Sequence, residues 1–185
     1  MMSKIIPAIL AISVADLETK LAQLPKEIIY VHLDVLENDV WTPINIDFEV
    51  HLMVREPEKI IDRWIERGAK RVIIHSLGGS TAKWAGIEIG LGVELSVSLE
   101  SITPLVSQVD FIHLMSIDAL GTQGDDFEPI IFDRIKVVRE KFPNIKISVD
   151  GGISKENYQK LISVGADRLI VGSGFKDLWN SLTKK

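Results

Sequence analysis

Two histidines and two aspartates stand at the ends of short apolar runs, at spacings that suit metal binding and proton transfer. His32 and Asp34 end one run, His51 lies near the end of the next, and Asp150 ends a later one. In a β-strand the side chains alternate between faces, so His32 and Asp34 point the same way. Two imidazoles and two carboxylates can hold one divalent ion and leave coordination positions open. Such a site suits proton transfer at a carbon next to a carbonyl group.

Short apolar runs alternate with amphipathic stretches along the chain. The runs are continuous rather than alternating, which is typical of parallel strands covered on both faces. The predicted strands are Lys4–Leu10, Ile28–Val35, Phe48–Val54, Arg71–His75, Gly92–Val97, Phe111–Ile117, Lys146–Asp150 and Arg168–Val171. The predicted helices are Asp16–Leu24, Pro57–Arg67, Ser101–Val109, Glu128–Phe142, Lys155–Val164 and Phe175–Leu182. Eight strands with helical connections favour a (β/α)8 barrel over an open doubly wound sheet.

Two connections do not read as full crossover helices. Leu36–Asp47 is too short and contains Trp41-Thr42-Pro43, and Leu77–Leu91 contains Gly78-Gly79 and Gly90. We therefore predict an α/β fold, a single (β/α)8 TIM barrel domain over residues 1–185, with the helix between strands two and three reduced or absent. The apolar residues of the first connection predict either a plug over the bare strands or the interface of a homodimer, which we prefer. These residues are Val40, Trp41, Pro43, Ile44 and Ile46.

The composition is that of an ordinary globular protein and excludes some functions. A formal charge of -5 provides no basic surface for nucleic acid or an anionic membrane, so neither is expected as a partner. The chain has no cysteine, which fits a reducing compartment, and we expect a cytoplasmic protein. Lys4 and the apolar stretch Ile5–Ala15 resemble a secretory signal, but Pro7 and the amphipathic pattern from Asp16 favour a buried strand over Ile5–Leu10.

In a barrel of this kind the catalytic groups gather at the carboxyl ends of the strands. Strand seven lies across the mouth from strands two and three, so Asp34 and Asp150 would flank a central metal. Epimerisation next to a ketone needs a base on one face and an acid on the other, which these carboxylates could supply. The metal would stabilise the enediolate as charge develops. The ligand types suit Zn, Fe(II), Mn or Co.

Two glycine-containing turns predict a phosphate site. Gly151-Gly152 and Gly172-Ser173 each follow a predicted strand and precede a predicted helix. Glycine lets the backbone approach an anion, and the amides of a helix start favour it. Because these turns follow strands seven and eight, they match the common phosphate position of (β/α)8 barrels. A small phosphorylated sugar is the expected partner.

The sequence resembles the ribulose-phosphate 3-epimerase family almost from end to end. The matching stretches are Pro7–Leu10, Val31–Val35, Val50–Val54 with Pro57, Thr103–Leu105, Met115-Ser116, Val149–Ile153 with Asn157, Gly165–Asp167 and Val171–Ser173. The resemblance implies that His32, Asp34, His51 and Asp150 are metal ligands and that Asp34 and Asp150 are the catalytic acid–base pair. It also implies that Met53 and Met115 lie near the reacting centre.

Departures from the family pattern concern the substrate side of the site. Ala8 replaces a serine, Leu36 replaces a methionine, and Glu37-Asn38 replaces Asp-Gly. The glycine-rich loop after Met115-Ser116 is altered, and only its Gly121 and Gly124 are candidates for phosphate contacts. The predicted activity is metal-dependent epimerisation at C3 of a ketopentose phosphate, D-ribulose 5-phosphate to D-xylulose 5-phosphate. The alternatives are an epimerase for another ketose phosphate and a degenerate barrel that binds a sugar phosphate or a protein without turnover.

Three further polar residues lie on predicted strands. His75 ends strand four, where it could touch substrate or cap a loop. His113 faces the same way as Met115 but one layer deeper, which favours a hydrogen-bonded core histidine. Glu49 shares the face of His51 and indicates a polar lower barrel.

Overall fold

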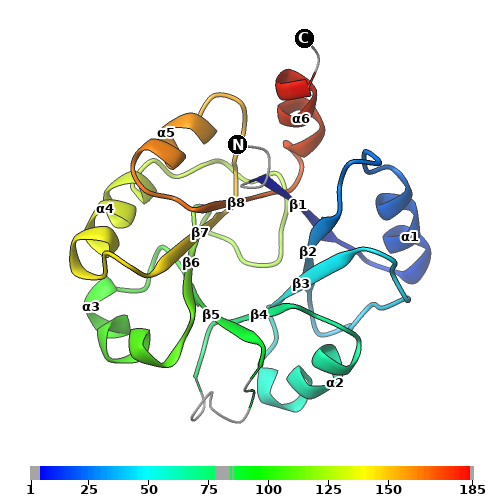
Figure 1. Cartoon of the computed structure of the whole chain (residues 1–185), viewed down its shortest axis with the longest axis horizontal. Coiled ribbons are helices and arrows are strands. Elements are labelled where there is room, and N and C mark those ends of the chain that lie inside the picture. Colours follow the sequence, from blue (N-terminus) through cyan, green and yellow to red (C-terminus); the bar gives the residue numbers. More distant parts are fainter. Residues whose placement is uncertain (1–4, 78–83, 85, 184–185) are drawn as a thin grey trace.

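A computed structural model describes residues 5–77, 84 and 86–183 and shows eight parallel strands in one closed barrel, in sequence order (Figure 1). The strands are β1 (Ile5–Leu10), β2 (Tyr30–Val35), β3 (Asp47–Leu52), β4 (Arg71–Ile74), β5 (Glu88–Val93), β6 (Phe111–Met115), β7 (Lys146–Asp150) and β8 (Arg168–Val171). The barrel closes where Ile5 of β1 pairs with Leu169 of β8. The predicted (β/α)8 fold is confirmed.

Helices surround the barrel on its outside (Figure 1). They are α1 (Val14–Ala22), η2 (Pro57–Lys59), α2 (Ile61–Glu66), α3 (Leu99–Ile102), η4 (Thr103–Gln108), α4 (Ile131–Lys141), α5 (Tyr158–Ser163) and α6 (Phe175–Thr183). Gly68 and Gly165, which follow the ends of α2 and α5, have φ of 100° and 120°, the left-handed conformation of a helix cap. Among the described residues, no helix combines the length and apolar composition needed to cross a membrane.

The fifth strand was predicted four residues too late. The sequence pattern placed it at Gly92–Val97 and left Gly90 in the preceding connection, whereas β5 is Glu88–Val93 and contains both glycines. Their lack of a side chain makes room inside the barrel. A Cβ on Gly90 would lie 2.4 Å from the Phe111 ring, and one on Gly92 would lie 2.7 Å from Nε2 of His75. Glycine within a strand here marks close packing rather than a turn. Residues 78–83 and 85 of the weak preceding connection lie outside the described residues.

No helix joins β2 to β3, which confirms the predicted reduction. The connecting segment, residues 36–46, folds back over the barrel wall, and four of its apolar residues pack against the core beneath it. The Trp41 ring lies 5.3 Å from the rings of Phe48 and Trp64, with the Arg67 guanidinium 5.2 Å from its centroid. These contacts support the predicted plug, while the homodimer stays a prediction.

The plug predicts a measurable contribution of Trp41 to stability. We expect Trp41→Ala to lower the free energy of unfolding by about 2 kcal/mol, less than a fully buried aromatic residue, because the ring is only partly buried. Urea denaturation measures the change. The matched control is Ile29→Ala, whose side chain is 77% exposed and which should change stability by less than about 0.5 kcal/mol. Equal effects of the two substitutions would contradict the plug.

The homodimer makes a separate prediction for the same residue. If two copies pair through residues 36–46, sedimentation velocity should show a dimer for the wild type and a monomer for Trp41→Asp. A wild type that sediments as a monomer at every concentration would leave the plug as the whole role of the segment.

Candidate metal centre and sugar-phosphate pocket

Strand register brings the four predicted acid–base and ligand residues to one end of the barrel. Asp34 of β2 pairs with His51 of β3, and His32 lies two residues earlier on the same face of β2. Asp150 is the last residue of β7 and pairs with Met115 of β6. Because all strands are parallel, these carboxyl-terminal positions open on the same mouth.

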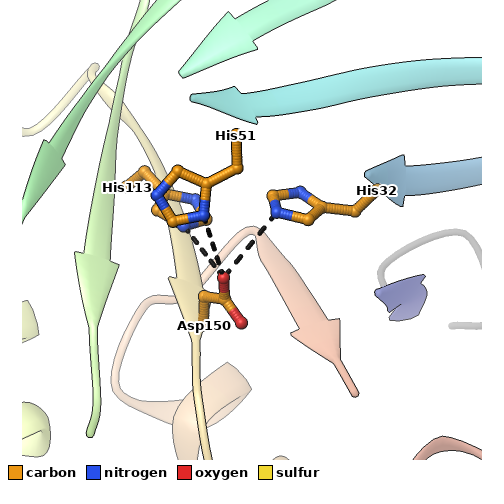
Figure 2. A group of neighbouring side chains, drawn as sticks. All are labelled: His32, His51, His113 and Asp150. Carbon is orange, nitrogen blue, oxygen red and sulfur yellow. Dashed lines mark hydrogen bonds and ion pairs between the residues drawn. The ribbon is translucent and has the colours of Figure 1, made fainter. Parts of the chain in front are cut away.

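Four buried side chains each offer one ligand atom within 4.8 Å of the others: His32, His51, His113 and Asp150 (Figure 2). Oδ2 of Asp150 is their common neighbour. It lies 3.7 Å from Nε2 of His32, 3.6 Å from Nδ1 of His51 and 3.2 Å from Nε2 of His113. Three imidazoles and one carboxylate at this spacing can hold a metal ion.

Asp34 is the second carboxylate that contacts His32 and His51. Its Oδ1 is 3.3 Å from Nε2 of His32 and 3.5 Å from Nδ1 of His51. Its Oδ2 accepts a hydrogen bond of 3.4 Å from the side-chain amide of Gln123. His32 Nε2 and His51 Nδ1 therefore each face two carboxylates.

The centre requires positive charge between its nitrogens and oxygens. Neither His32 Nε2 nor His51 Nδ1 has a partner that meets hydrogen-bond geometry among the described residues, and both are buried. A nitrogen lone pair and a carboxylate oxygen repel unless a proton or a cation lies between them. The unpartnered nitrogens and the oxygen-rich surroundings thus fit a divalent cation.

The pKa values of these groups express the same requirement. Burial alone would lower the pKa of a histidine, but the carboxylates of Asp34 and Glu49 raise that of His32 to about 10. Burial also opposes charge at His51, yet Asp150 and Asp34 raise its pKa. Against the effect of burial, the histidines hold the pKa values of Asp34 and Asp150 below their usual range. Without a cation, the centre would hold protons in its place.

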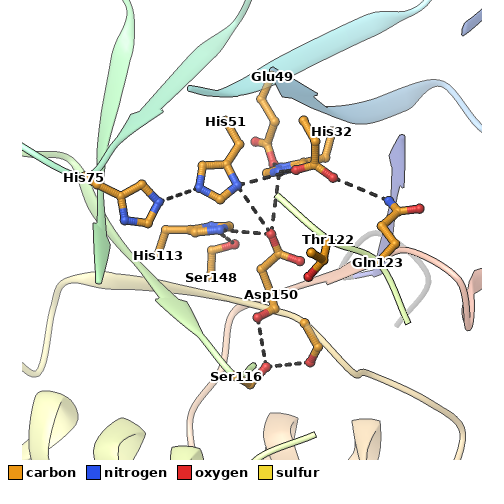
Figure 3. Close-up of polar contacts among 12 residues, drawn as sticks. His32, Glu49, His51, His75, His113, Ser116, Thr122, Gln123, Ser148 and Asp150 are labelled. Carbon is orange, nitrogen blue, oxygen red and sulfur yellow. Dashed lines mark hydrogen bonds and ion pairs between the residues drawn. The ribbon is translucent and has the colours of Figure 1, made fainter. Parts of the chain in front are cut away.

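His75 supports His51 rather than capping a loop. Nε2 of His75 is 2.7 Å from Nε2 of His51, and the rings stack with centroids 5.0 Å apart (Figure 3). Burial, followed by the positive charge of His51 and His113, lowers the pKa of His75 to about 3, so it is neutral and can accept a hydrogen. If His51 donates from Nε2, its Nδ1 is free to face the two aspartates.

His113 is the residue of the centre that the sequence analysis assigned to the core rather than to the metal site. It is fully buried and hydrogen-bonded, as predicted, but its Nε2 contacts Asp150 and its Nδ1 lies 3.3 Å from the Ser148 hydroxyl. The available signal was that His113 shares the strand face of Met115, which is predicted to lie near the reacting centre. On β6, His113 pairs with Ser148, and Met115 two residues on pairs with Asp150. The register of β6 against β7, which the sequence does not reveal, brings it to the aspartate.

The remaining predicted residues line one pocket over the centre. Asp34, His51 and Asp150 form part of its wall. The other predicted residues that line it are Met53, Met115, Gly121, Gly124, Gly151, Gly152, Gly172 and Ser173. Gly152 has a φ of 59°, and a Cβ there would lie 2.7 Å from the backbone of Phe127, so the turn needs glycine.

The departures from the family pattern also lie at this pocket. Ala8 lines it, as do Gln123 and Thr122 of the altered loop. Gly121 in that loop has a φ of 76° and sits so close to Leu36 that a Cβ would lie 3.0 Å from the leucine. Ala8, Thr122 and Gln123 therefore border the space that a ligand would occupy, and Leu36 packs against the loop above it, whereas Glu37-Asn38 does not line the pocket.

Solved structures of other proteins share this fold. A phosphoribosyl anthranilate isomerase from Thermus thermophilus superposes with a TM-score of 0.64 at 11% identity, covering 92% of this chain and 88% of that one. A chain of the tryptophan synthase complex from Pyrococcus furiosus gives 0.65 at 13% identity, covering 98% and 92%. At these identities the likeness shows the fold alone.

Sequence comparison identifies the family. The ribulose-phosphate 3-epimerase of Schizosaccharomyces pombe is 26% identical over 92% of this chain and 86% of its own length. The chloroplastic ribulose-5-phosphate-3-epimerase of Arabidopsis thaliana is 30% identical over 80% of this chain and 63% of its own. The match with the Aquifex aeolicus ribulose-phosphate 3-epimerase also spans only 63% of that enzyme. The family model for ribulose-phosphate 3 epimerases matches residues 4–176. The resemblance and the predicted enzyme class, an isomerase of carbohydrates, are confirmed: the chain belongs to the ribulose-phosphate 3-epimerase family.

Proposed function

We propose that the protein epimerises a ketopentose phosphate at C3, interconverting D-ribulose 5-phosphate and D-xylulose 5-phosphate. The observation that carries this proposal is the pocket that joins two aspartates, a metal-competent histidine cluster and two glycine turns at one barrel mouth. Membership of the epimerase family supports the substrate class.

The proposed ligands of the divalent ion are His32, Asp34, His51 and Asp150. The two histidines offer the nitrogens that lack hydrogen bonds, whereas both nitrogens of His113 already have partners in Asp150 and Ser148. A bound cation would supply positive charge beside the carbonyl oxygen on which negative charge develops during the reaction. His113 then acts by donating to Asp150 and holding its carboxylate.

Asp34 and Asp150 are the proposed proton-transfer groups. One carboxylate takes the proton from C3, so that the C–H electrons move toward the carbonyl and an enediolate forms. The other, as the carboxylic acid, returns a proton to C3 on the opposite face and inverts the carbon. The two residues line the same pocket from β2 and β7. Met53 and Met115 line it as well and provide apolar surface around the reacting carbons.

Backbone amides are the proposed phosphate contacts. Among the described residues, those that line the pocket include no lysine or arginine, so an anion there would depend on N–H groups. Gly151-Gly152 and Gly172-Ser173 border the pocket from the ends of β7 and β8, and Gly121 and Gly124 border it from the loop above.

The cytoplasmic location and the homodimer stay predictions.

The metal predicts a stoichiometry and a reversible loss of activity. Purified protein should contain or bind about one divalent ion per chain, as measured by elemental analysis. Chelation should abolish epimerisation, and adding back Zn, Mn, Co or Fe(II) should restore it. Full activity in protein freed of metal would overturn the proposed ligand roles.

The two carboxylates predict nearly complete loss of turnover with the fold retained. We expect Asp34→Asn and Asp150→Asn each to lower kcat by about a hundredfold or more, since each removes an acid–base group. A coupled assay for the epimerised sugar phosphate measures the loss, and circular dichroism checks the fold. Asp133→Asn, at an exposed position of α4, is the matched control. A wild type that binds metal and sugar phosphate without turnover would instead establish the binding-only alternative.

A further inference from the structure

A buried carboxylate outside the proposed reaction lies directly beneath the metal centre. Glu49 of β3 is 1% exposed, and its Oε1 is 2.9 Å from Nδ1 of His32 (Figure 3). Its Oε2 is 2.7 Å from Nη2 of Arg168 and 3.3 Å from the Tyr30 hydroxyl. Both carboxylate oxygens thus have partners, although almost no solvent reaches the group.

This contact determines which nitrogen of His32 carries hydrogen. A carboxylate paired with an arginine can only accept, so His32 must donate to it from Nδ1. In the neutral ring, Nε2 then has a free lone pair. That nitrogen is the one that faces Asp34 and Asp150 and lacks a hydrogen-bond partner. Glu49 therefore sets both the tautomer and the ring orientation that metal binding needs.

Arg168 and Tyr30 hold Glu49 from the opposite end of the barrel. They are the first residues of β8 and β2, and the Arg168 guanidinium lies 5.3 Å from the centroid of the Tyr30 ring. A buried charge without its partner is strongly unfavourable, so the arginine supplies the opposite charge that this carboxylate needs. A continuous polar path thus runs from the amino-terminal ends of the strands through Glu49 to His32.

We propose that Glu49 is a positioning residue for His32 and that Arg168 and Tyr30 hold its carboxylate in place. The path Arg168–Glu49–His32 orients one ligand of the metal centre from beneath and adds negative charge to it. This inference rests on the proposed function, because it requires a cation at His32. Its effect is on metal affinity, since Glu49 does not line the substrate pocket.

Direct metal titration tests the proposal without an activity assay. Co(II) affinity is followed by visible absorption, and Zn(II) affinity by competition with a chromophoric chelator. Glu49→Gln should weaken both by about 10- to 100-fold, the range for partners of metal-binding histidines. Arg168→Met should weaken them by a smaller factor. In the double variant, Arg168→Met should add little to Glu49→Gln, because the arginine acts through the glutamate.

Arg71→Met is the matched control. Arg71 also begins a strand at the amino-terminal end of the barrel and lies opposite Glu49 in the register of β4 against β3. Its guanidinium, however, forms its salt bridge with Glu88, whose side chain is about half exposed. Its loss should leave metal affinity unchanged. Equal weakening by Arg71→Met and Arg168→Met would show a general electrostatic effect and overturn the proposed path.

The outcomes separate this inference from the proposed function. A folded Glu49→Gln that binds metal as tightly as the wild type would refute the role of Glu49 and leave the proposed function standing. A wild type without any metal affinity would refute both. Should Glu49→Gln fail to fold, Tyr30→Phe and Arg168→Met decide: unchanged affinity in both refutes the path.

Discussion

Buried charge at the carboxyl end of the barrel is the constraint on which the rest of the structure depends. Asp34, Asp150 and three imidazoles share a space that solvent barely enters, and their nitrogen and oxygen atoms approach one another to 3.2–3.7 Å. Such an arrangement is stable only if positive charge lies within it, as protons or as a cation. Without positive charge the centre is unfavourable. For the same reason it is a good site for a cation.

Support for this centre is distributed around the barrel. Glu49 contacts His32 from β3, His75 contacts His51 from the position just after β4, and Ser148 contacts His113 from β7. Each of these partners contacts the histidine nitrogen that does not face the aspartates. A rigid barrel suits this purpose, because each strand is held by two neighbours and a ring cannot turn without disturbing its packing.

Space inside so small a barrel is obtained by omitting side chains. Gly92 leaves room for the His75 ring, and Gly90 does the same for Phe111. At the mouth, Gly151 and Gly152 have positive φ, and side chains there would collide with Ile117 and with the backbone of Phe127. The connection between β2 and β3 is also reduced, because Trp41 packs against Trp64 and Phe48 and covers the barrel wall without a helix.

The sequence alone determined the barrel, the reduced connection after β2 and the family, because apolar runs, amphipathic stretches and the His-x-Asp pattern are local signals. It also identified His32, Asp34, His51 and Asp150 as a group, since parallel strands bring their ends to one mouth. Tertiary structure alone decided the register of neighbouring strands, and with it the contact of His113 with Asp150 and of Glu49 with Arg168, 119 residues apart in sequence. It also decided that Gly90 and Gly92 belong within β5. Glycine is needed at these positions because the Phe111 and His75 rings occupy the space that a side chain would fill. Contacts between strands depend on which side chains meet across the barrel, and no local pattern in one strand contains that information.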